Sequence, residues 1–302
     1  MPDSMRSRLL GRSGLRVSEL CLGTMTFGTE WGFGAEEATC REIYAAFREA
    51  GGTLLDTADV YNDGASERIV GRLVAAERDA VVLGTKFTLP TDRNDPNSGG
   101  SHRKGLRRSV EESLRRLATD HVTCCGCAHA WDECTAAEET LRALDDLIRS
   151  GNVPAVGVSN TPAWVIARSQ AIVELRGWSA HCGLQVEYSL AARSPDRELL
   201  PMARALGLTV TAWSPLARGL LVGKRPPSRL PVSRRQALDA VTEIAAETGL
   251  TPARVALAWV LRQGLLPVLD TRTLAPVARH DFLYNRRTAL APPKPEPGDH
   301  DR

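Results

Sequence analysis

Two hydrophobic patterns alternate along this chain. Stretches with apolar residues three and four apart, typical of an amphipathic helix, are followed by a glycine and then by a short apolar run that ends in polar residues. This order is complete in three passages, residues 43–59, 143–160 and 199–214. A glycine stands where a left-handed C-cap ends a helix in each of them: Gly51, Gly151 and Gly207. The pattern predicts repeated helix and strand pairs.

Counting the apolar runs gives the number of strands. Eight candidates lie near residues 19–23, 53–56, 81–86, 121–128, 153–158, 183–187, 208–213 and 266–269. Threonine followed by proline marks two helix starts, at Thr161-Pro162 and Thr251-Pro252, as a cap followed by a first-turn proline. Eight strands alternating with helices predict an α/β fold, a (β/α)8 TIM barrel formed by residues 1–290 as a single domain. Residues 291–302 are rich in proline and charge, which predicts a disordered tail.

A doubly wound sheet is the competing architecture. Its dinucleotide fingerprint needs a third glycine and a turn from strand to helix, and Gly32-Phe33-Gly34 offers neither. The barrel is therefore favoured.

Charge and composition narrow the partners. The net charge is +2 in 302 residues, with no basic block, which predicts a small-molecule partner and no nucleic acid. No apolar run reaches the roughly 20 residues of a spanning helix, and the first residues lack an apolar signal core, so we expect no membrane and a cytoplasmic location. Seven cysteines in a chain of this length favour free thiols.

Four polar residues stand at the predicted ends of consecutive strands, where a barrel gathers its active site: Asp56, Tyr61, Lys86 and His129. Taken singly, the aspartate could cap a helix, and the tyrosine and histidine could be packing residues. Together they have a chemical logic. A buried ammonium needs a carboxylate partner, for which Asp56 is the candidate. An ammonium beside Tyr61 would lower the pKa of its hydroxyl from about 10, so that it could deliver a proton near neutral pH.

At these residues the chain resembles the aldo-keto reductase family. The match runs through LLDTADVYNDGASERIVGR, VVLGTKF, HAWDE, GVSNTPAW, LQVEYSL and WSPLARGLLVGK, in the family's order. The resemblance implies NADPH-dependent reduction of a small-molecule carbonyl substrate, an aldehyde or ketone, to an alcohol. Asp56, Tyr61, Lys86 and His129 match the catalytic tetrad: Tyr61 as general acid, Lys86 and Asp56 tuning it, and His129 orienting the carbonyl.

The resemblance also assigns the NADPH site. Ser159, Asn160 and Gln185 match residues at the nicotinamide carboxamide, and Trp213 matches the aromatic ring that stacks on the nicotinamide. Arg272 matches the basic residue at the 2'-phosphate of the adenosine. The remaining positions are Gly23, Thr24, Met25 and Asp56, and the pyrophosphate loop residues Ser214, Leu216, Gly219 and Lys224. From the residues alone, Ser159 and Asn160 could form a helix cap before Pro162, and the two roles can coexist.

The stretch CCGCAHAWDEC at 124–134 raises a metal or thiol alternative. Same-face residues on one strand are about 6.6 Å apart, whereas thiolates on one zinc lie roughly 3.8 Å apart, so one strand does not wrap a metal easily. We therefore expect no metal, with Cys125 and Cys127 as small fillers inside the barrel. A metal site and a redox or nucleophilic cysteine remain the alternatives.

The chain departs from the family pattern at several places. Residues 123–127 replace bulky apolar residues in the fourth strand, and Pro154 falls within the expected fifth strand. Asp270 stands where the family usually has glycine, and Pro276 and His280 replace polar residues near the adenine. These changes leave a second hypothesis open, a binding or regulatory protein on the reductase barrel with little turnover.

Overall fold

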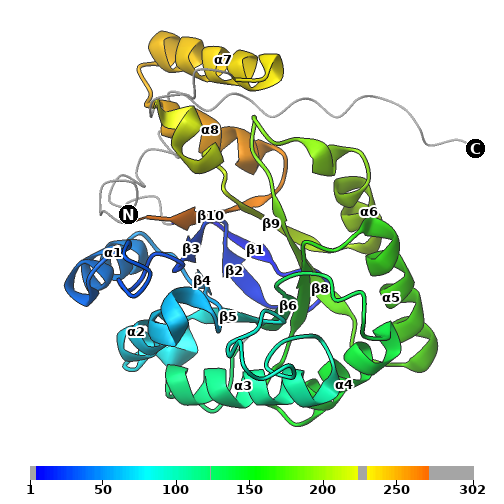
Figure 1. The fold of residues 1–302 in the computed structure, drawn as a ribbon. Helices are drawn as coiled ribbons and strands as arrows, with labels where there is room; N and C mark the ends of the chain where they lie inside the picture. Colours follow the sequence, from blue (N-terminus) through cyan, green and yellow to red (C-terminus); the bar gives the residue numbers. More distant parts are fainter. Residues whose placement is uncertain (1–4, 123, 224–229, 272–302) are drawn as a thin grey trace, which may run out of the picture.

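The computed structural model describes residues 5–122, 124–223 and 230–271, without the side chains of 124–128. Within these ranges eight parallel strands close into a barrel in the order β10-β3-β4-β5-β6-β7-β8-β9 (Figure 1). The strands are β3 (Cys21–Gly23), β4 (Leu54–Asp56), β5 (Val82–Phe87), β6 (Cys124–Ala128), β7 (Val156–Ser159), β8 (His181–Glu187), β9 (Thr209–Trp213) and β10 (Leu266–Asp270). The predicted (β/α)8 barrel is confirmed, and each strand lies at its predicted place.

Helices surround the barrel on its outside (Figure 1). They are α1 (Glu37–Glu49), α2 (Ala65–Val74), α3 (Arg103–Leu117), α4 (Ala137–Arg149), α5 (Ala163–Arg176), α6 (Leu199–Leu206), α7 (Val232–Thr248) and α8 (Pro252–Arg262). Short 3-10 turns are η1 (Tyr61–Gly64), η2 (Arg78–Ala80), η3 (Ser194–Asp196) and η4 (Ala217–Val222). The core lies between the outward apolar face of the strands and the inner face of these helices, as the clustering of Leu22, Leu55 and Leu83 with Phe47 illustrates.

An antiparallel hairpin precedes the barrel and was not predicted from the sequence. It consists of β1 (Ser7–Leu9) and β2 (Arg16–Ser18). Leu10 and Val17 pack in one buried cluster with the first residues of several barrel strands, among them Cys21, Leu54, Val82 and Leu266. The hairpin therefore closes the N-terminal end of the barrel, and the site lies at the other end.

The predicted helix ends are largely confirmed. Gly51, Gly151 and Gly207 all have positive φ. Thr251 stands at the N-cap position of α8 with Pro252 in the first turn, as predicted, but its side chain makes no capping hydrogen bond. The other Thr-Pro pair is displaced by one residue, because α5 begins at Ala163 with Pro162 at the cap position.

Two departures from the family pattern, at Pro154 before β7 and at the cysteines of β6, can be compared with the structure. Pro154 precedes β7, which begins at Val156, so no strand hydrogen bond is lost to the proline. Between β5 and β6 the register shifts, so that Thr85 pairs with Cys125 and Lys86 with Cys127. This irregularity interrupts the regular alternation on which the interior placement of Cys125 and Cys127 was based, and their side chains lie outside the described part of the chain.

Candidate active site

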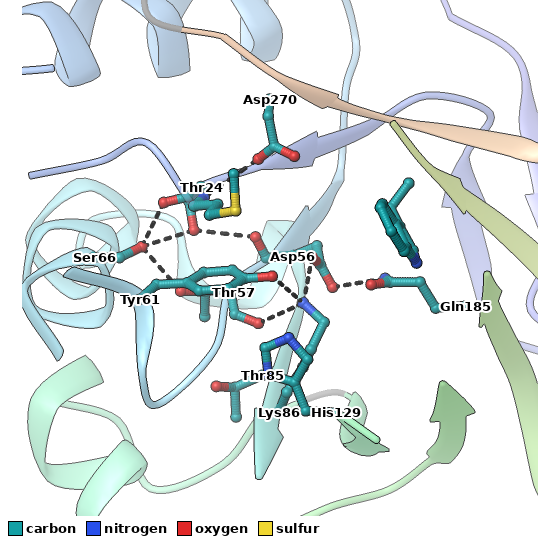
Figure 2. A network of polar contacts seen from close by, with 12 residues as sticks. Thr24, Asp56, Thr57, Tyr61, Ser66, Thr85, Lys86, His129, Gln185 and Asp270 are labelled. Atoms are coloured by element: carbon teal, nitrogen blue, oxygen red, sulfur yellow. Dashed lines mark hydrogen bonds and ion pairs between the residues drawn. The ribbon is translucent and has the colours of Figure 1, made fainter. Parts of the chain in front are cut away.

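The four predicted side chains meet at the C-terminal end of the barrel (Figure 2). Asp56 is the last residue of β4, Lys86 is near the end of β5, and His129 directly follows β6. Tyr61 opens the η1 turn that leads from β4 to α2. The parallel arrangement brings these strand ends to one edge, and residues far apart in the sequence become neighbours.

Lys86 is the centre of this group. Its side chain is 1% exposed, and its Nζ donates hydrogen bonds to Asp56 Oδ2 at 2.5 Å, to the Thr57 carbonyl at 3.0 Å and to the Tyr61 hydroxyl at 3.0 Å. Burial alone would lower the pKa of Lys86, but the Asp56 carboxylate and Tyr61 raise it above its ordinary value. The lysine therefore stays charged, and the predicted pairing with Asp56 is confirmed.

Tyr61 differs from the prediction in its acidity. Its ring is buried, and this burial raises the pKa of its hydroxyl to about 12; Lys86 lowers the pKa, while Asp56 and Asp270 raise it further. The prediction of a lowered pKa was wrong for this structure, because the loss of solvent around the ring outweighs the nearby ammonium. Tyr61 therefore holds its proton at neutral pH.

His129 packs edge-on against Tyr61, with the ring centroids 5.8 Å apart and an interplanar angle of 82°. Burial and the Lys86 ammonium lower the pKa of His129 to about 4, against an opposing effect of Asp56. The imidazole is therefore neutral near pH 7 and carries one N–H donor. A donor beside the Tyr61 hydroxyl can contact the same substrate oxygen.

A network of hydroxyl groups holds the loop after β3 against the end of β4. Thr24 donates to the Asp56 carbonyl through its backbone N–H at 2.9 Å and through its side chain at 3.0 Å. Ser66 on α2 donates to the Thr24 carbonyl at 2.7 Å and shares a 3.1 Å hydroxyl contact with Thr57. The position of Gly23, Thr24 and Met25 is thus tied to the strand that carries Asp56.

The residues that the resemblance assigns to the nicotinamide lie on the neighbouring strand ends. Gln185 on β8 donates from its amide to Asp56 Oδ1 at 3.0 Å. Asn160, after β7, has a positive φ of 45° and donates to the His129 carbonyl at 3.0 Å. Its amide oxygen accepts a hydrogen bond from the indole N–H of Trp213, the last residue of β9, at 3.3 Å. Asn160 thereby joins the two sides of the site.

The helix-cap alternative for Ser159 and Asn160 is wrong. No side chain caps α5, since Asn160 bonds to His129 and Trp213 instead. The Ser159 hydroxyl is buried and has no hydrogen-bond partner among the described residues. A buried hydroxyl of this kind is ready to bind a polar group of a ligand.

The loop after β9 contains the other assigned residues. Ser214 has a positive φ of 54° and accepts a hydrogen bond from the Ala217 N–H at 2.9 Å. Leu216 accepts a bond from the Gly219 N–H at 3.0 Å, and Gly219 has a φ of 92°. These bonds form a compact turn at the edge of the site. Lys224, Arg272, Pro276 and His280 lie outside the described residues.

Aromatic residues border the site that the sequence analysis did not single out. Trp31 and Phe33, in the loop before α1, lie 5.9 Å apart between ring centroids, and Trp31 packs edge-on against Tyr61 at 6.4 Å. Trp131, two residues after His129, packs against Trp164 at 5.8 Å. All four aromatic rings are partly or largely exposed. Two of them, Trp31 and Trp131, could have been noticed in the sequence as tryptophans in polar loops at the active end of a barrel.

No metal centre is found in the part of the chain that the structure describes. Within it, no three His, Cys, Asp or Glu side chains come together in a way that could hold an ion. That part leaves out the side chains of Cys124, Cys125 and Cys127. The described cysteines Cys21, Cys40, Cys134 and Cys182 form no disulfide. Among the described residues, no helix is long and apolar enough to cross a bilayer.

Comparisons with known proteins identify the family of this chain. Residues 19–279 match the profile of the Aldo/keto reductase family. An uncharacterized oxidoreductase of Bacillus subtilis is 39% identical over 294 residues, covering 89% of this chain and 88% of that protein. A norsolorinic acid reductase of Emericella nidulans is 35% identical, over 87% of this chain and 73% of that protein. An aryl-alcohol dehydrogenase of Pestalotiopsis microspora is 32% identical, over 90% and 78%.

The fold and these matches define an oxidoreductase built on a (β/α)8 barrel. The chain belongs to the aldo/keto reductase family.

Proposed function

We propose that this protein reduces an aldehyde or ketone to an alcohol with NADPH, with Tyr61 as the general acid. The observation that carries the proposal is the hydrogen-bonded chain from Asp56 through Lys86 to Tyr61, placed at the end of the barrel where such enzymes act. A buried ion pair is seldom retained for stability alone, and here it ends on an ionisable hydroxyl.

The proton is supplied by the protein. NADPH, when bound, provides the hydride for the carbonyl carbon. As negative charge develops on the carbonyl oxygen, the Tyr61 O–H bond breaks and its proton moves to that oxygen. An alkoxide is a stronger base than a phenolate, so this transfer is favourable even with the raised pKa of Tyr61. Lys86 Nζ, 3.0 Å from the tyrosine oxygen, stabilises the phenolate that remains.

The described residues fit the dinucleotide. The unpartnered Ser159 hydroxyl, the Gln185 amide and the Asn160 amide are the kinds of donor and acceptor that a carboxamide requires. The half-buried Trp213 ring supplies an aromatic face beside them. We assign the carboxamide to these three polar side chains and the nicotinamide ring to Trp213. Gly23, Thr24, Met25, Ser214, Leu216, Gly219, Lys224 and Arg272 are proposed for the rest of the cofactor.

The substrate side favours an aromatic carbonyl compound. Trp31 and Phe33 are 37% and 39% exposed, and Trp31 lies against the proposed acid. Exposed aromatic rings beside a catalytic group bind flat apolar ligands through offset or edge contacts. The name of one relative, an aryl-alcohol dehydrogenase, points in the same direction.

The test is to mix the purified protein with NADPH and a panel of aliphatic and aromatic aldehydes and ketones, and to follow NADPH consumption at 340 nm. We expect turnover, faster with aryl carbonyls. Tight NADPH binding without turnover of any member would favour the alternative of a binding or regulatory protein. The absence of NADPH binding would contradict the proposal altogether.

A further inference from the structure

Asp270 adds a carboxylate to this end of the barrel, in line with Asp56. It is the last residue of β10, and its Oδ1 accepts a hydrogen bond from the Met25 backbone N–H at 3.3 Å. Figure 2 shows the carboxylate directed to the loop that carries Thr24, on the same side of the barrel as Asp56. The side chain is exposed to solvent, so a ligand can reach it.

Gly23 is what makes room for this carboxylate. In the strand register Gly23 pairs with Asp270 on one side and with Asp56 on the other. A Cβ atom at position 23 would lie 2.4 Å from Asp270 Oδ1 and 2.8 Å from the Val268 side chain, closer than real contacts allow. The row Asp270, Gly23 and Asp56 thus sets two carboxylates on either side of a bare backbone.

The charges in this row are not balanced. Asp56 is paired with Lys86, whereas Asp270 contacts only a neutral N–H group among the described residues. The described charged groups that act on Asp270 are Asp56 on β4 and Lys86 on β5. Part of the carboxylate is accessible to solvent, but the surrounding protein removes much of its hydration. This desolvation, together with the Asp56 charge, raises the pKa of Asp270 to about 6, while Lys86 and the bond from Met25 lower it. The carboxylate is therefore largely ionised at pH 7.5 and takes up a proton in mild acid.

We propose that Asp270 sets the affinity of this enzyme for its dinucleotide, with the ionised carboxylate opposing the anionic cofactor and the protonated form admitting it. This inference rests on the proposed function, because Gly23, Thr24 and Met25 are the residues assigned to NADPH and Asp270 lies against them. A dinucleotide with a pyrophosphate and a 2'-phosphate carries several negative charges, and an uncompensated carboxylate nearby repels it. Asp270 thus determines the affinity for the cofactor, and the proton for the reaction still comes from Tyr61.

The experiment measures the Kd of NADP⁺, the form that is stable in acid, by isothermal titration calorimetry on the full chain. At pH 7.5 and low salt, Asp270→Asn and Asp270→Gly should each bind NADP⁺ on the order of tenfold more tightly than the wild type. The gain should shrink in about 0.5 M salt, because an exposed charge is screened. Asp239→Asn, on the exposed side of α7, removes the same charge elsewhere and should leave the Kd unchanged.

The pH dependence gives a second readout. Between pH 7.5 and 5.5 the wild type should gain more affinity than Asp270→Asn does. Both proteins meet the same titrating cofactor phosphate, so the difference between them isolates Asp270. Unchanged binding in both Asp270 variants would overturn this inference and leave the proposed function standing. Weaker binding would also overturn it, by making the carboxylate a hydrogen-bond acceptor for the cofactor. Failure of every variant and of the wild type to bind would overturn both proposals.

Discussion

The Lys86 ammonium lies 3.0 Å from the Tyr61 hydroxyl and is almost completely buried. Two further bonds, to the Asp56 carboxylate and to the Thr57 carbonyl, direct its N–H groups. The lysine cannot rotate away without leaving a charge unpaired in a place that solvent does not reach. The distance from charge to acid is therefore fixed by the fold before any ligand binds.

Replacing Tyr61 by Phe should remove most of the turnover and leave cofactor binding nearly intact. General acid catalysis contributes about 10²- to 10⁴-fold, and the phenyl ring keeps the packing against His129. We expect kcat to fall by at least about 100-fold and the Kd for NADPH to change by less than a factor of about two, because the hydroxyl acts on the substrate oxygen. Equal kcat in the variant and the wild type would remove Tyr61 from the proton transfer.

Replacing Lys86 by Met should destabilise the fold more than an ordinary lysine substitution. The variant leaves the Asp56 carboxylate with only the Gln185 amide as a partner, which costs about 3 kcal/mol in free energy of unfolding. Urea unfolding measures this loss, and the matched control is Lys104→Met, at an exposed position of α3. Asp56→Asn added to the Lys86 variant should restore part of the stability. An unchanged midpoint in Lys86→Met would show that the ion pair is not a source of stability.

The aromatic contact with Tyr61 predicts a selective effect on substrates. Trp31→Leu should raise the KM for an aryl aldehyde by about two- to tenfold, the value of one aromatic pair, and that for a short aliphatic aldehyde much less. The variant also loses the bond from the Trp31 indole to Asp63. Trp178→Leu is the matched control, because that residue packs against Arg142 on α4. Parallel changes in both KM values would argue against an aryl subsite at Trp31.

Acid sensitivity should arise in part from His181, the first residue of β8. Burial lowers the pKa of His181 to about 4, so below pH 6.5 the unfolded chain binds a proton that the folded chain refuses. The folded state thus loses stability as pH falls from about 6.5 towards 4. Between pH 7 and pH 5 the loss is about 1 to 2 kcal/mol.

His181→Leu should reduce that pH-dependent loss, measured as urea unfolding free energies at the two pH values. His129 titrates in the same direction and keeps its share in the variant. A half-exposed histidine, replaced in His121→Gln, serves as the control. The same pH dependence in the wild type and His181→Leu would mean that other groups cause the loss of stability in acid.

The sequence predicted the barrel and the position of the four central residues because both depend on repeating patterns. Asp56, Lys86 and His129 follow apolar runs, and parallel strands align their ends without further information. The acidity of Tyr61 could not be predicted, since it is decided by how much protein surrounds the ring. The hairpin β1–β2 was missed because its short strands, Ser7–Leu9 and Arg16–Ser18, are mostly polar and form no apolar run.

The partners of Asn160 were likewise beyond the sequence. A helix cap is a local interaction and can be expected from neighbouring residues. The bonds that Asn160 makes with His129 and Trp213 instead join residues 31 and 53 positions apart. The charge at Asp270 was visible as a departure from the family, but its contact with Met25 joins residues 245 apart. Long-range contacts of this kind depend on the closure of the whole barrel.

The hairpin at the N-terminal end has a consequence for how this protein can change. Ser18 at its edge bonds with Thr53 and Leu54, so the hairpin is fastened directly to the start of β4. Because this hairpin lies at the end of the barrel opposite the site, it makes no contact that depends on the loops around the site. Exposed side chains of those loops, such as Trp31, can therefore change without loosening the hairpin. New substrate preferences can arise in this way without a change in the barrel.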